Sequence, residues 1–290
     1  MKLPPFEYHL AESVEEAVAL LAQWGDEAKV LAGGQSLVPL LSFRLARPAH
    51  LVDVNTIAEL TYISDGSGLE IGATVRQRDA ERSEVVAAEA PIVAAALGFV
   101  GHAAIRNRGT VGGSIAHADP AAELPAVLTA LRGEVVARST RGVRTIPAES
   151  FIEGFLTTAL ESDELVTAIR LPPWPASTGW AFNEFSRRNG DFAIVGVATL
   201  VGIGPDGRVN DSRIVFSGAG TTPVRAVGAE RAMIGEVPSP ALWAAAGAQA
   251  GAELDPPADL HGSANYRRQL ARVLAARSLD EAHQRAKGAQ

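Results

Sequence analysis

The pattern of hydrophobic and polar positions predicts a β-α-β unit within about the first 55 residues. A capping box formed by Ser13 and Glu16 opens the first helix. Its apolar residues recur at helical spacing: Val14, Ala17, Val18, Leu21 and Trp24. Segments 29–32 and 50–54 are short and apolar, which is typical of strands, and an amphipathic helix is predicted between them over 37–45.

From about residue 56 to residue 171 the pattern changes to short strands mixed with helices. A hairpin is predicted around the turn Asp65-Gly66-Ser67-Gly68. Helices are expected over 77–89, 91–99 and 120–132, and strands near 134–138, 143–146 and 165–171. Segment 100–118 is rich in glycine, and we expect it to be a long loop.

The run Pro172-Pro173-Trp174-Pro175 is the strongest linker signal, because proline extends neither a helix nor a central strand. Beyond it the pattern predicts strands near 180–187, 192–203 and 209–218, helices near 225–235, 239–252 and 263–277, and a frayed tail over 280–290. We therefore predict two domains. Residues 1–175 form the first, divided into a βαβ subdomain (1–55) and an α+β subdomain (56–175), and residues 176–290 form the second.

Composition narrows the function. The 290 residues are 47% hydrophobic and carry a net charge of -7, which disfavours a general role in binding nucleic acid or anionic membranes. The first residues lack the apolar core of a signal peptide. The longest apolar run, Phe192 to Pro205, falls short of the ~20 residues that span a bilayer. We expect a cytoplasmic protein without a membrane span.

The chain contains no cysteine, so it offers no disulfide, no thiolate nucleophile and no ligands for an iron–sulfur cluster. Its six histidines are scattered, and we expect no metal site. The nucleophile motif GxSxG is absent, and we assign no catalytic side chain. Redox chemistry in this protein has to come from a bound organic cofactor.

The first candidate site is Ala32-Gly33-Gly34-Gln35-Ser36-Leu37, where a predicted strand runs through two glycines into a helix. Without Cβ atoms the backbone N–H groups can closely approach a phosphate, and Ser36 can add a hydroxyl donor. The motif is neither the Rossmann fingerprint nor a P-loop. A tight strand–helix turn with no ligand would have the same sequence, and both interpretations stay open.

The second candidate is Arg108-Gly109-Thr110-Val111-Gly112-Gly113-Ser114, another pair of glycines with hydroxyl residues. Two such turns suit a ligand with two phosphates, although a bulge or a mobile loop tip would explain this turn alone. Carboxylates near the turns could bind ribose hydroxyls or cap helices: Asp53, Asp119 and Glu123. His102 and His117 flank the loop, and we favour a structural role for both.

Taken together, four motifs resemble the flavin-carrying medium subunit of carbon monoxide dehydrogenase and related molybdenum hydroxylases. They are Ala32 to Leu37, Ile105 to Pro120, Gly190-Asp191-Phe192-Ala193, and Ser263-Ala264-Asn265-Tyr266-Arg267-Arg268. The resemblance implies an α+β fold, with a vanillyl-alcohol-oxidase (PCMH)-type FAD-binding domain in two subdomains. A C-terminal domain with a three-stranded antiparallel sheet and a helical bundle would follow it.

The resemblance also assigns cofactor contacts. It implies that Ala32, Gly33, Gly34, Gln35 and Ser36 hold one side of the FAD pyrophosphate, with Leu37 beside them. Thr110, Gly113 and Ser114 would hold the other side, with Val100, His102, Ile105 and Gly112 in the same segment. Glu123 would lie near the adenosine ribose, and Leu165, Val166 and Phe182 near the isoalloxazine.

Two positions depart from the family pattern. Many relatives have His in place of Gln35, which preserves a hydrogen-bond donor. Many have Lys in place of Glu184, and a negative charge near the flavin would disfavour its anionic reduced form.

By the same resemblance, a large partner carries the molybdenum cofactor and a small partner carries two [2Fe-2S] clusters, in an (αβγ)2 heterohexamer. Electrons would leave the FAD for a quinone, O2, NAD+ or another small molecule. The alternatives are a stand-alone flavin oxidoreductase of the same fold and a non-redox nucleotide-binding module. The substrate stays open among carbon monoxide, purines, N-heterocycles and aldehydes, because the resemblance places its chemistry on another subunit.

Overall fold

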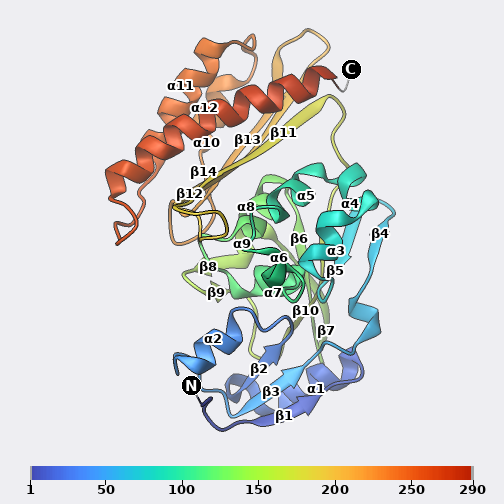
Figure 1. The fold of residues 1–290 in the computed structure, drawn as a ribbon. Coiled ribbons are helices and arrows are strands. Elements are labelled where there is room, and N and C mark those ends of the chain that lie inside the picture. The colour runs from blue at the N-terminus through green and yellow to red at the C-terminus, as the bar shows by residue number, and fades with distance from the viewer. Residues whose placement is uncertain (1, 289–290) are drawn as a thin grey trace.

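The computed structural model describes residues 2–288, which form three layers of sheet and helix stacked along one direction (Figure 1). The N-terminal lobe lies at the bottom of the view, the middle part holds most of the short helices, and the C-terminal sheet lies beneath the long last helix. No helix among these residues is both long and apolar enough to cross a bilayer.

The N-terminal lobe is a parallel three-stranded sheet in the order β1-β3-β2, with β1 at Glu7–Leu10, β2 at Ala28–Leu31 and β3 at His50–Asp53. The predicted β-α-β unit is confirmed. β1 was not predicted, because Tyr8 and Leu10 are exposed and the strand has no buried apolar face to mark it. The helices of the lobe are α1 (Val14–Trp24), the 3-10 turn η1 (Gly25–Glu27) and α2 (Leu37–Ser42).

The middle part is built on a five-stranded antiparallel sheet in the order β4-β5-β10-β6-β7. Its strands are β4 (Ile63–Asp65), β5 (Leu69–Gly72), β6 (Glu134–Ser139), β7 (Gly142–Pro147) and β10 (Leu165–Leu171). The surrounding elements are η2 (Ala58–Leu60), α3 (Gln77–Arg82), α4 (Glu84–Glu89), α5 (Pro91–Leu97), α6 (Ala103–Arg106), α7 (Val111–His117), α8 (Glu123–Ala130), α9 (Ala148–Phe151), β8 (Ile152–Gly154) and β9 (Thr157–Thr158).

The prediction that segment 100–118 is a loop was wrong, because it contains α6 and α7. Glycine has low helix propensity, so the Gly112-Gly113 pair conceals α7 in the sequence. The start predicted for α8 was also wrong. Asp119 Oδ1 accepts a hydrogen bond from Ala121 N at 2.8 Å, which forms a turn, and α8 begins only at Glu123.

The C-terminal sheet has the order β11-β12-β13-β14 and is antiparallel throughout. The three predicted strands are confirmed as β11 (Thr178–Phe185), β12 (Val195–Ile203) and β13 (Val209–Ser217), and the two-residue β14 (Val224–Arg225) adds a short edge. Every residue of β12 is buried. One face of the sheet joins the core around α5 and α8, and the other packs against the C-terminal helices. A strand covered on both faces explains the long apolar run in the sequence.

The C-terminal helices are α10 (Val227–Met233), α11 (Pro240–Glu253) and α12 (Ala264–Gly288). The expectation of a frayed tail from residue 280 was wrong for the described residues, because Ala282 and Ala286 are buried. Gly179 explains this packing: a Cβ there would lie 1.8 Å from the Ala282 carbonyl oxygen. The missing side chain lets α12 lie directly on β11. Residues 289 and 290 lie outside the described residues.

Candidate functional site at two glycine-rich turns

The two glycine-rich turns meet in space, although more than seventy residues separate them in the sequence. A Cβ on Gly33 would lie 2.4 Å from the Arg108 carbonyl oxygen and 2.7 Å from Gly109 Cα. The backbones are therefore in direct contact, and only glycine at position 33 permits this approach. The structure thus brings the first motif, at the carboxyl end of β2, against the second, at the start of α7.

The first turn presents a run of backbone donors. Within residues 2–288 no protein acceptor is recorded for the N–H groups of the five residues from Gly33 to Leu37. Gly34 has φ +70°, a conformation that favours glycine and that is typical of turns whose successive N–H groups bind anions. The Ser36 hydroxyl makes no capping hydrogen bond to α2. This turn can therefore donate several hydrogen bonds to an anion.

The second turn uses its N–H groups to pack against the protein. Val111 N donates to Val75 O, and Gly112 N donates to Ala73 O, both at 3.0 Å. Gly113 N donates to the Thr110 hydroxyl at 3.1 Å, which caps α7. The hydroxyls remain available, because Thr110 can still donate its proton and Ser114 has no side-chain hydrogen bond within the described chain. The second turn can thus supply hydroxyl groups but few backbone donors.

Two residues that the sequence analysis missed hold the turns together. Asn55 Nδ2 donates to the Ala32 carbonyl oxygen at 2.8 Å. Arg76 donates to Asn55 Oδ1 at 2.8 Å and to the Arg108 carbonyl oxygen at 2.7 Å. These hydrogen bonds link Ala32 through Asn55 and Arg76 to Arg108. They therefore fix the Ala32 carbonyl of the first turn relative to the Arg108 carbonyl of the second. No motif marked either side chain, because their roles depend on contacts between distant segments.

The structure assigns Asp53 to this support. Its carboxylate accepts hydrogen bonds from Tyr8 Oη, Asn55 N and Asn55 Nδ2, at 2.8, 2.8 and 2.6 Å. With these donors in place, Asp53 orients Asn55 and is poorly placed to bind a sugar.

The buried Glu123 and the partly buried Glu184 lie close enough for their charges to interact. Glu123 begins α8 and is only 8% exposed, and Glu184 lies on β11 with one carboxylate oxygen buried and unpaired. Burial raises the pKa of Glu123 to about 7, an effect that nearby Asp119 increases and Arg106 opposes. Burial and the charge of Glu123 raise the pKa of Glu184 to about 8. The negative charge expected at position 184 is therefore weakened near neutral pH.

The third motif reaches the same region from the C-terminal part. A Cβ on Gly190 would lie 2.4 Å from His102 Cε1, so the 190–193 turn lies against the start of α6. Phe182 of β11 meets Phe99 edge to face, with 5.3 Å between ring centroids. Ile105 packs against Gly101 and is partly exposed. The Val100 carbonyl accepts a hydrogen bond from the buried Arg106 at 2.9 Å.

Three of the predicted contact residues have their side chains in the protein core. Leu165 belongs to the core of the N-terminal lobe, and Val166 and Phe182 belong to the core of the middle part. Their proposed contacts with a cofactor remain predictions. His117 is half-buried. Burial lowers its pKa below the usual value, and the negative charge of Asp119 partly offsets this shift.

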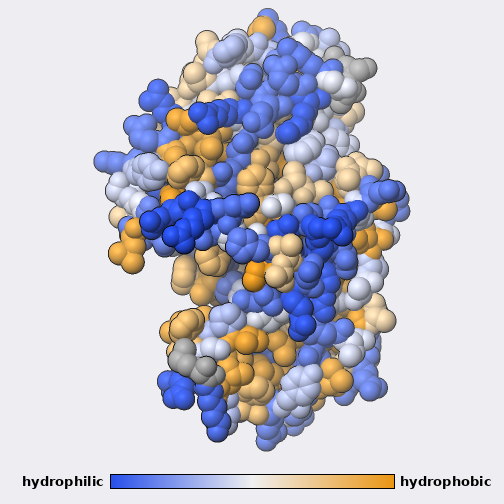
Figure 2. Space-filling view, viewed as in Figure 1, coloured by the Kyte–Doolittle hydropathy of each residue, from blue (hydrophilic) through white to orange (hydrophobic). Residues whose placement is uncertain are grey.

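In the space-filling view the outline is notched between the lower lobe, which holds β1, β2 and β3, and the middle of the molecule (Figure 2). Two other surface hollows lie away from the turns, one beside Glu149 and Arg225, the other beside Glu59 and Arg170. Neither contains a residue of the glycine-rich turns, and we assign neither to the site.

Two family models together match most of the chain. The family model described as "FAD binding domain in molybdopterin dehydrogenase" matches residues 4–174. The model described as "CO dehydrogenase flavoprotein C-terminal domain" matches residues 180–282. The chain is 43% identical over 288 residues to the 6-hydroxypseudooxynicotine dehydrogenase complex subunit alpha of Paenarthrobacter nicotinovorans, covering 99% of this chain and 97% of that one.

Two solved structures superpose over almost the whole chain. Carbon monoxide dehydrogenase from Hydrogenophaga pseudoflava matches with a TM-score of 0.95 at 40% identity, covering 98% of this chain and 99% of that one. Quinoline 2-oxidoreductase from Pseudomonas putida 86 matches with a TM-score of 0.94 at 37% identity, covering 100% and 99%. The fold predicted from the resemblance is confirmed.

Proposed function

Because this chain belongs to the family of FAD-binding medium subunits of molybdenum hydroxylases, we propose that it relays electrons within a complex of several subunits. The chain is an oxidoreductase subunit with FAD as its cofactor. The proposal concerns the route of the electrons: from [2Fe-2S] clusters of a small partner, to the flavin held here, and on to an external acceptor.

One observation carries the proposal: the N–H groups of the five residues from Gly33 to Leu37, which have no acceptor among residues 2–288, lie on a turn that contacts the second glycine motif. Donors arranged in this way suit the oxygens of a diphosphate. We propose that Ala32, Gly33, Gly34, Gln35, Ser36 and Leu37 hold the FAD diphosphate through this backbone. Thr110 and Ser114 would add hydroxyl donors from the opposite turn.

The remaining predicted contacts are proposed with it. Gly113 would allow α7 to approach the cofactor, and Gly112, which packs α7 against Ala73, would lie in the same segment with Val100, His102 and Ile105. The buried Glu123 would face the ribose, as the resemblance implies. Leu165, Val166 and Phe182 would support the flavin ring from the core behind it.

Bound FAD would supply the redox chemistry, because it can exchange electrons with both one-electron and two-electron partners. The residues of this chain would bind it, orient it and set the charge around it. No side chain acts as a nucleophile in this proposal. The raised pKa of Glu184, about 8, would keep its carboxyl group largely protonated near pH 7. Glu184 would therefore add less negative charge near the flavin than an ordinary glutamate.

We propose a large partner with the molybdenum cofactor and a small partner with the clusters, in an (αβγ)2 arrangement. The relative from Paenarthrobacter nicotinovorans is named as a subunit of a dehydrogenase complex, which supports partners of this kind. The acceptor would be a quinone or another small molecule. The substrate would bind the large partner, so residues of this chain would not select it.

The domain division at residues 175 and 176 also remains part of the proposal. It is supported by the end of β10 at Leu171 and the start of β11 at Thr178. The cytoplasmic location expected from the sequence stays a prediction.

Purification of the native complex through a tag on this chain tests the proposal. We expect a flavin absorption band near ~450 nm, FAD released on denaturation, and co-purification of a large molybdenum-containing chain and a small iron–sulfur chain. A flavin band without partner chains would favour a stand-alone flavin oxidoreductase. A colourless protein would contradict both functions and favour a nucleotide-binding module without redox chemistry.

A further inference from the structure

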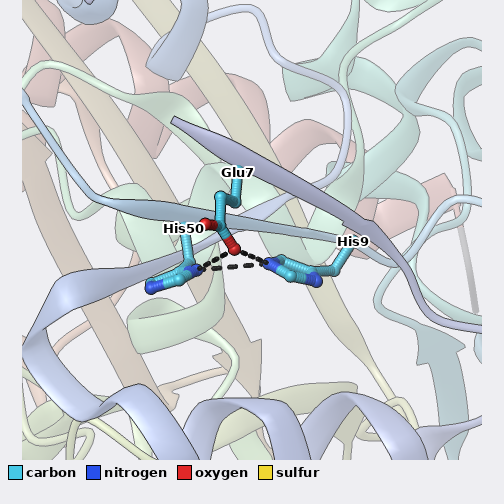
Figure 3. Close-up of side chains that lie close together, drawn as sticks. All are labelled: Glu7, His9 and His50. Atoms are coloured by element: carbon cyan, nitrogen blue, oxygen red, sulfur yellow. Dashed lines mark hydrogen bonds and ion pairs between the residues drawn. The ribbon is translucent and has the colours of Figure 1, made fainter. Parts of the chain in front are cut away.

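Glu7, His9 and His50 bring three potential metal ligands together on the N-terminal lobe (Figure 3). Glu7 and His9 alternate along β1 and so point to the same face of the sheet. His50 begins β3 and is paired with Glu7 in the parallel register. No local motif indicates this cluster, because the two histidines are forty-one positions apart in the sequence.

The distances fit a single ion. His9 Nε2 lies 3.2 Å from His50 Nδ1, and Glu7 Oε2 lies 3.9 Å from His9 Nε2 and 3.7 Å from His50 Nδ1. A circle through three atoms with these separations has a radius of about 2.1 Å, which is the usual bond length from zinc to imidazole nitrogen or carboxylate oxygen. An ion at its centre would reach all three ligands without movement of the backbone.

The surroundings favour a fixed pair of imidazoles. Trp24 stacks on His50 with 4.0 Å between centroids and an angle of 4°, and its centroid lies 4.3 Å from that of His9. Both histidines are mostly covered, with side-chain exposures of 24% and 14%, whereas the Glu7 side chain is 74% exposed. Two held nitrogens and one solvent-facing carboxylate leave open positions for water on the outer side.

This cluster lies apart from the glycine-rich turns. Glu7 and His50 are the first residues of their parallel strands, whereas the turn at Gly33 follows the carboxyl end of β2. The two features therefore occupy opposite ends of the same small sheet. Binding at one end is chemically independent of the diphosphate contacts proposed at the other.

We propose that Glu7, His9 and His50 form a site for a divalent transition-metal ion of the zinc type, which clamps β1 to β3. Imidazole nitrogens and a carboxylate form a ligand set suited to Zn²⁺, Co²⁺ and Ni²⁺. The ion stabilises the lobe by cross-linking a short, exposed edge strand to the centre of the sheet. It takes no part in electron transfer.

Zinc titration of the full chain, stripped of metal with a chelator, tests the site by calorimetry. We expect one ion per chain with a Kd at or below about 10 μM, and His9→Ala or His50→Ala to weaken it at least about tenfold. His261→Ala, an exposed histidine in the C-terminal part, is the matched control and should leave the affinity unchanged. Glu7→Ala changes an exposed side chain, so it tests a ligand without threatening the fold.

Tryptophan fluorescence gives a second readout at the site itself. Ni²⁺ or Co²⁺ next to His50 should quench Trp24, and Trp24→Phe should abolish this quenching while keeping one bound ion per chain. Zinc at about 100 times its Kd should also raise the melting temperature by a few degrees. Absence of binding up to about 1 mM Zn²⁺ would overturn the proposal and leave a simple histidine–histidine hydrogen bond. Binding that survives both histidine substitutions would overturn it equally.

Discussion

The two glycine-rich turns look alike in the sequence, but they differ in what their backbones do. In the first turn, the N–H groups from Gly33 to Leu37 have no acceptor among the described residues. In the second, Val111, Gly112 and Gly113 donate to Val75, Ala73 and Thr110. The first turn therefore offers donors to a ligand, and the second uses its donors to hold its own position.

Their glycines differ in the same way. Gly33 is needed so that the two turns can touch, and Gly112 is needed so that α7 can lie against Ala73, since a Cβ there would come within 2.6 Å of the Ala73 Cβ. A repeated Gly-Gly pair thus has two physical causes in one molecule: contact between two turns, and close packing of a helix. Substitutions in the two turns should separate binding from stability.

The largest effect on binding is expected from Gly33→Ala. The new Cβ would meet the Arg108 carbonyl oxygen at 2.4 Å, so the two backbones must move apart. We expect the Kd for FAD, measured by quenching of flavin fluorescence, to rise at least about 100-fold, or about 2.7 kcal/mol. Gly66→Ala is the matched control, because nothing lies within 4 Å of a Cβ there. Equal affinity in both variants would show that contact between the turns is not needed for binding.

Gly112→Ala should act mainly on stability. A Cβ in the tight space beside Ala73 overpacks the helix, and such changes cost about 1–3 kcal/mol. Urea denaturation of the flavin-free chain should show this loss, while the FAD affinity of the folded variant should fall less than in Gly33→Ala. A variant with normal stability and severely impaired binding would reverse the roles that we assign to the turns.

Asn55→Ala tests the link between the two turns. It removes the hydrogen bonds to Ala32 O and from Arg76, so the first turn loses a fixed reference to the second. We expect FAD affinity to fall about tenfold, which corresponds to the roughly 1–2 kcal/mol cost of such hydrogen bonds. Asn265→Ala, which affects only an exposed contact with Arg268, serves as the control. An unchanged Kd would mean that the turns hold their positions without this bridge.

The acidic pair beside the second turn predicts a dependence of stability on pH. Burial and the charge of Asp119 raise the pKa of Glu123 to about 7, and burial and the charge of Glu123 raise the pKa of Glu184 to about 8. The folded state therefore holds these protons more tightly than the unfolded state does. This contribution is fully present below pH 4.5 and is lost as pH rises through about 7 to 8.

We expect the free energy of unfolding of the flavin-free chain to fall between pH 6 and pH 9 by at most roughly 4 kcal/mol, at about 1.4 kcal/mol per proton and pH unit. Glu184→Gln should flatten this fall, because it removes one of the two titrating groups. Glu27→Gln, at an exposed position near η1, should not change the slope. A steeper fall in Glu184→Gln would show that the two carboxyls do not interact as the structure indicates.

The sequence predicted the elements with a clear buried face and missed those whose form depends on tertiary contacts. β12 was found because its apolar run is continuous. β1 was missed because it is exposed, and α7 because glycines that favour packing disfavour helix in isolation. The end of α12 was missed because its burial depends on Gly179, about a hundred residues away.

The candidate site divides in the same way. The turns themselves were visible in the sequence, since glycine pairs beside hydroxyl residues form a local pattern. Asn55 and Arg76 could not be predicted from the sequence. Their role depends on hydrogen bonds to the carbonyl groups of Ala32 and Arg108, which only the fold brings within reach. The cluster of Glu7, His9 and His50 was not predicted for the same reason, because only the pairing of β1 with β3 brings these residues together.

The smallest effects should come from the hydroxyls, and they compare the two turns most directly. Ser36 and Ser114 each lack a protein partner for the side chain among residues 2–288, so each can donate to a bound diphosphate. We expect Ser36→Ala and Ser114→Ala each to raise the Kd for FAD about threefold, in line with roughly 0.5–1 kcal/mol per neutral hydrogen bond. The double variant should raise it about tenfold if the sites act independently. Ser67→Ala, in the exposed hairpin turn, controls for loss of a surface hydroxyl. If only Ser36→Ala weakens binding, the second turn acts purely as the surface against which the first is held, and its hydroxyl does not contact the cofactor.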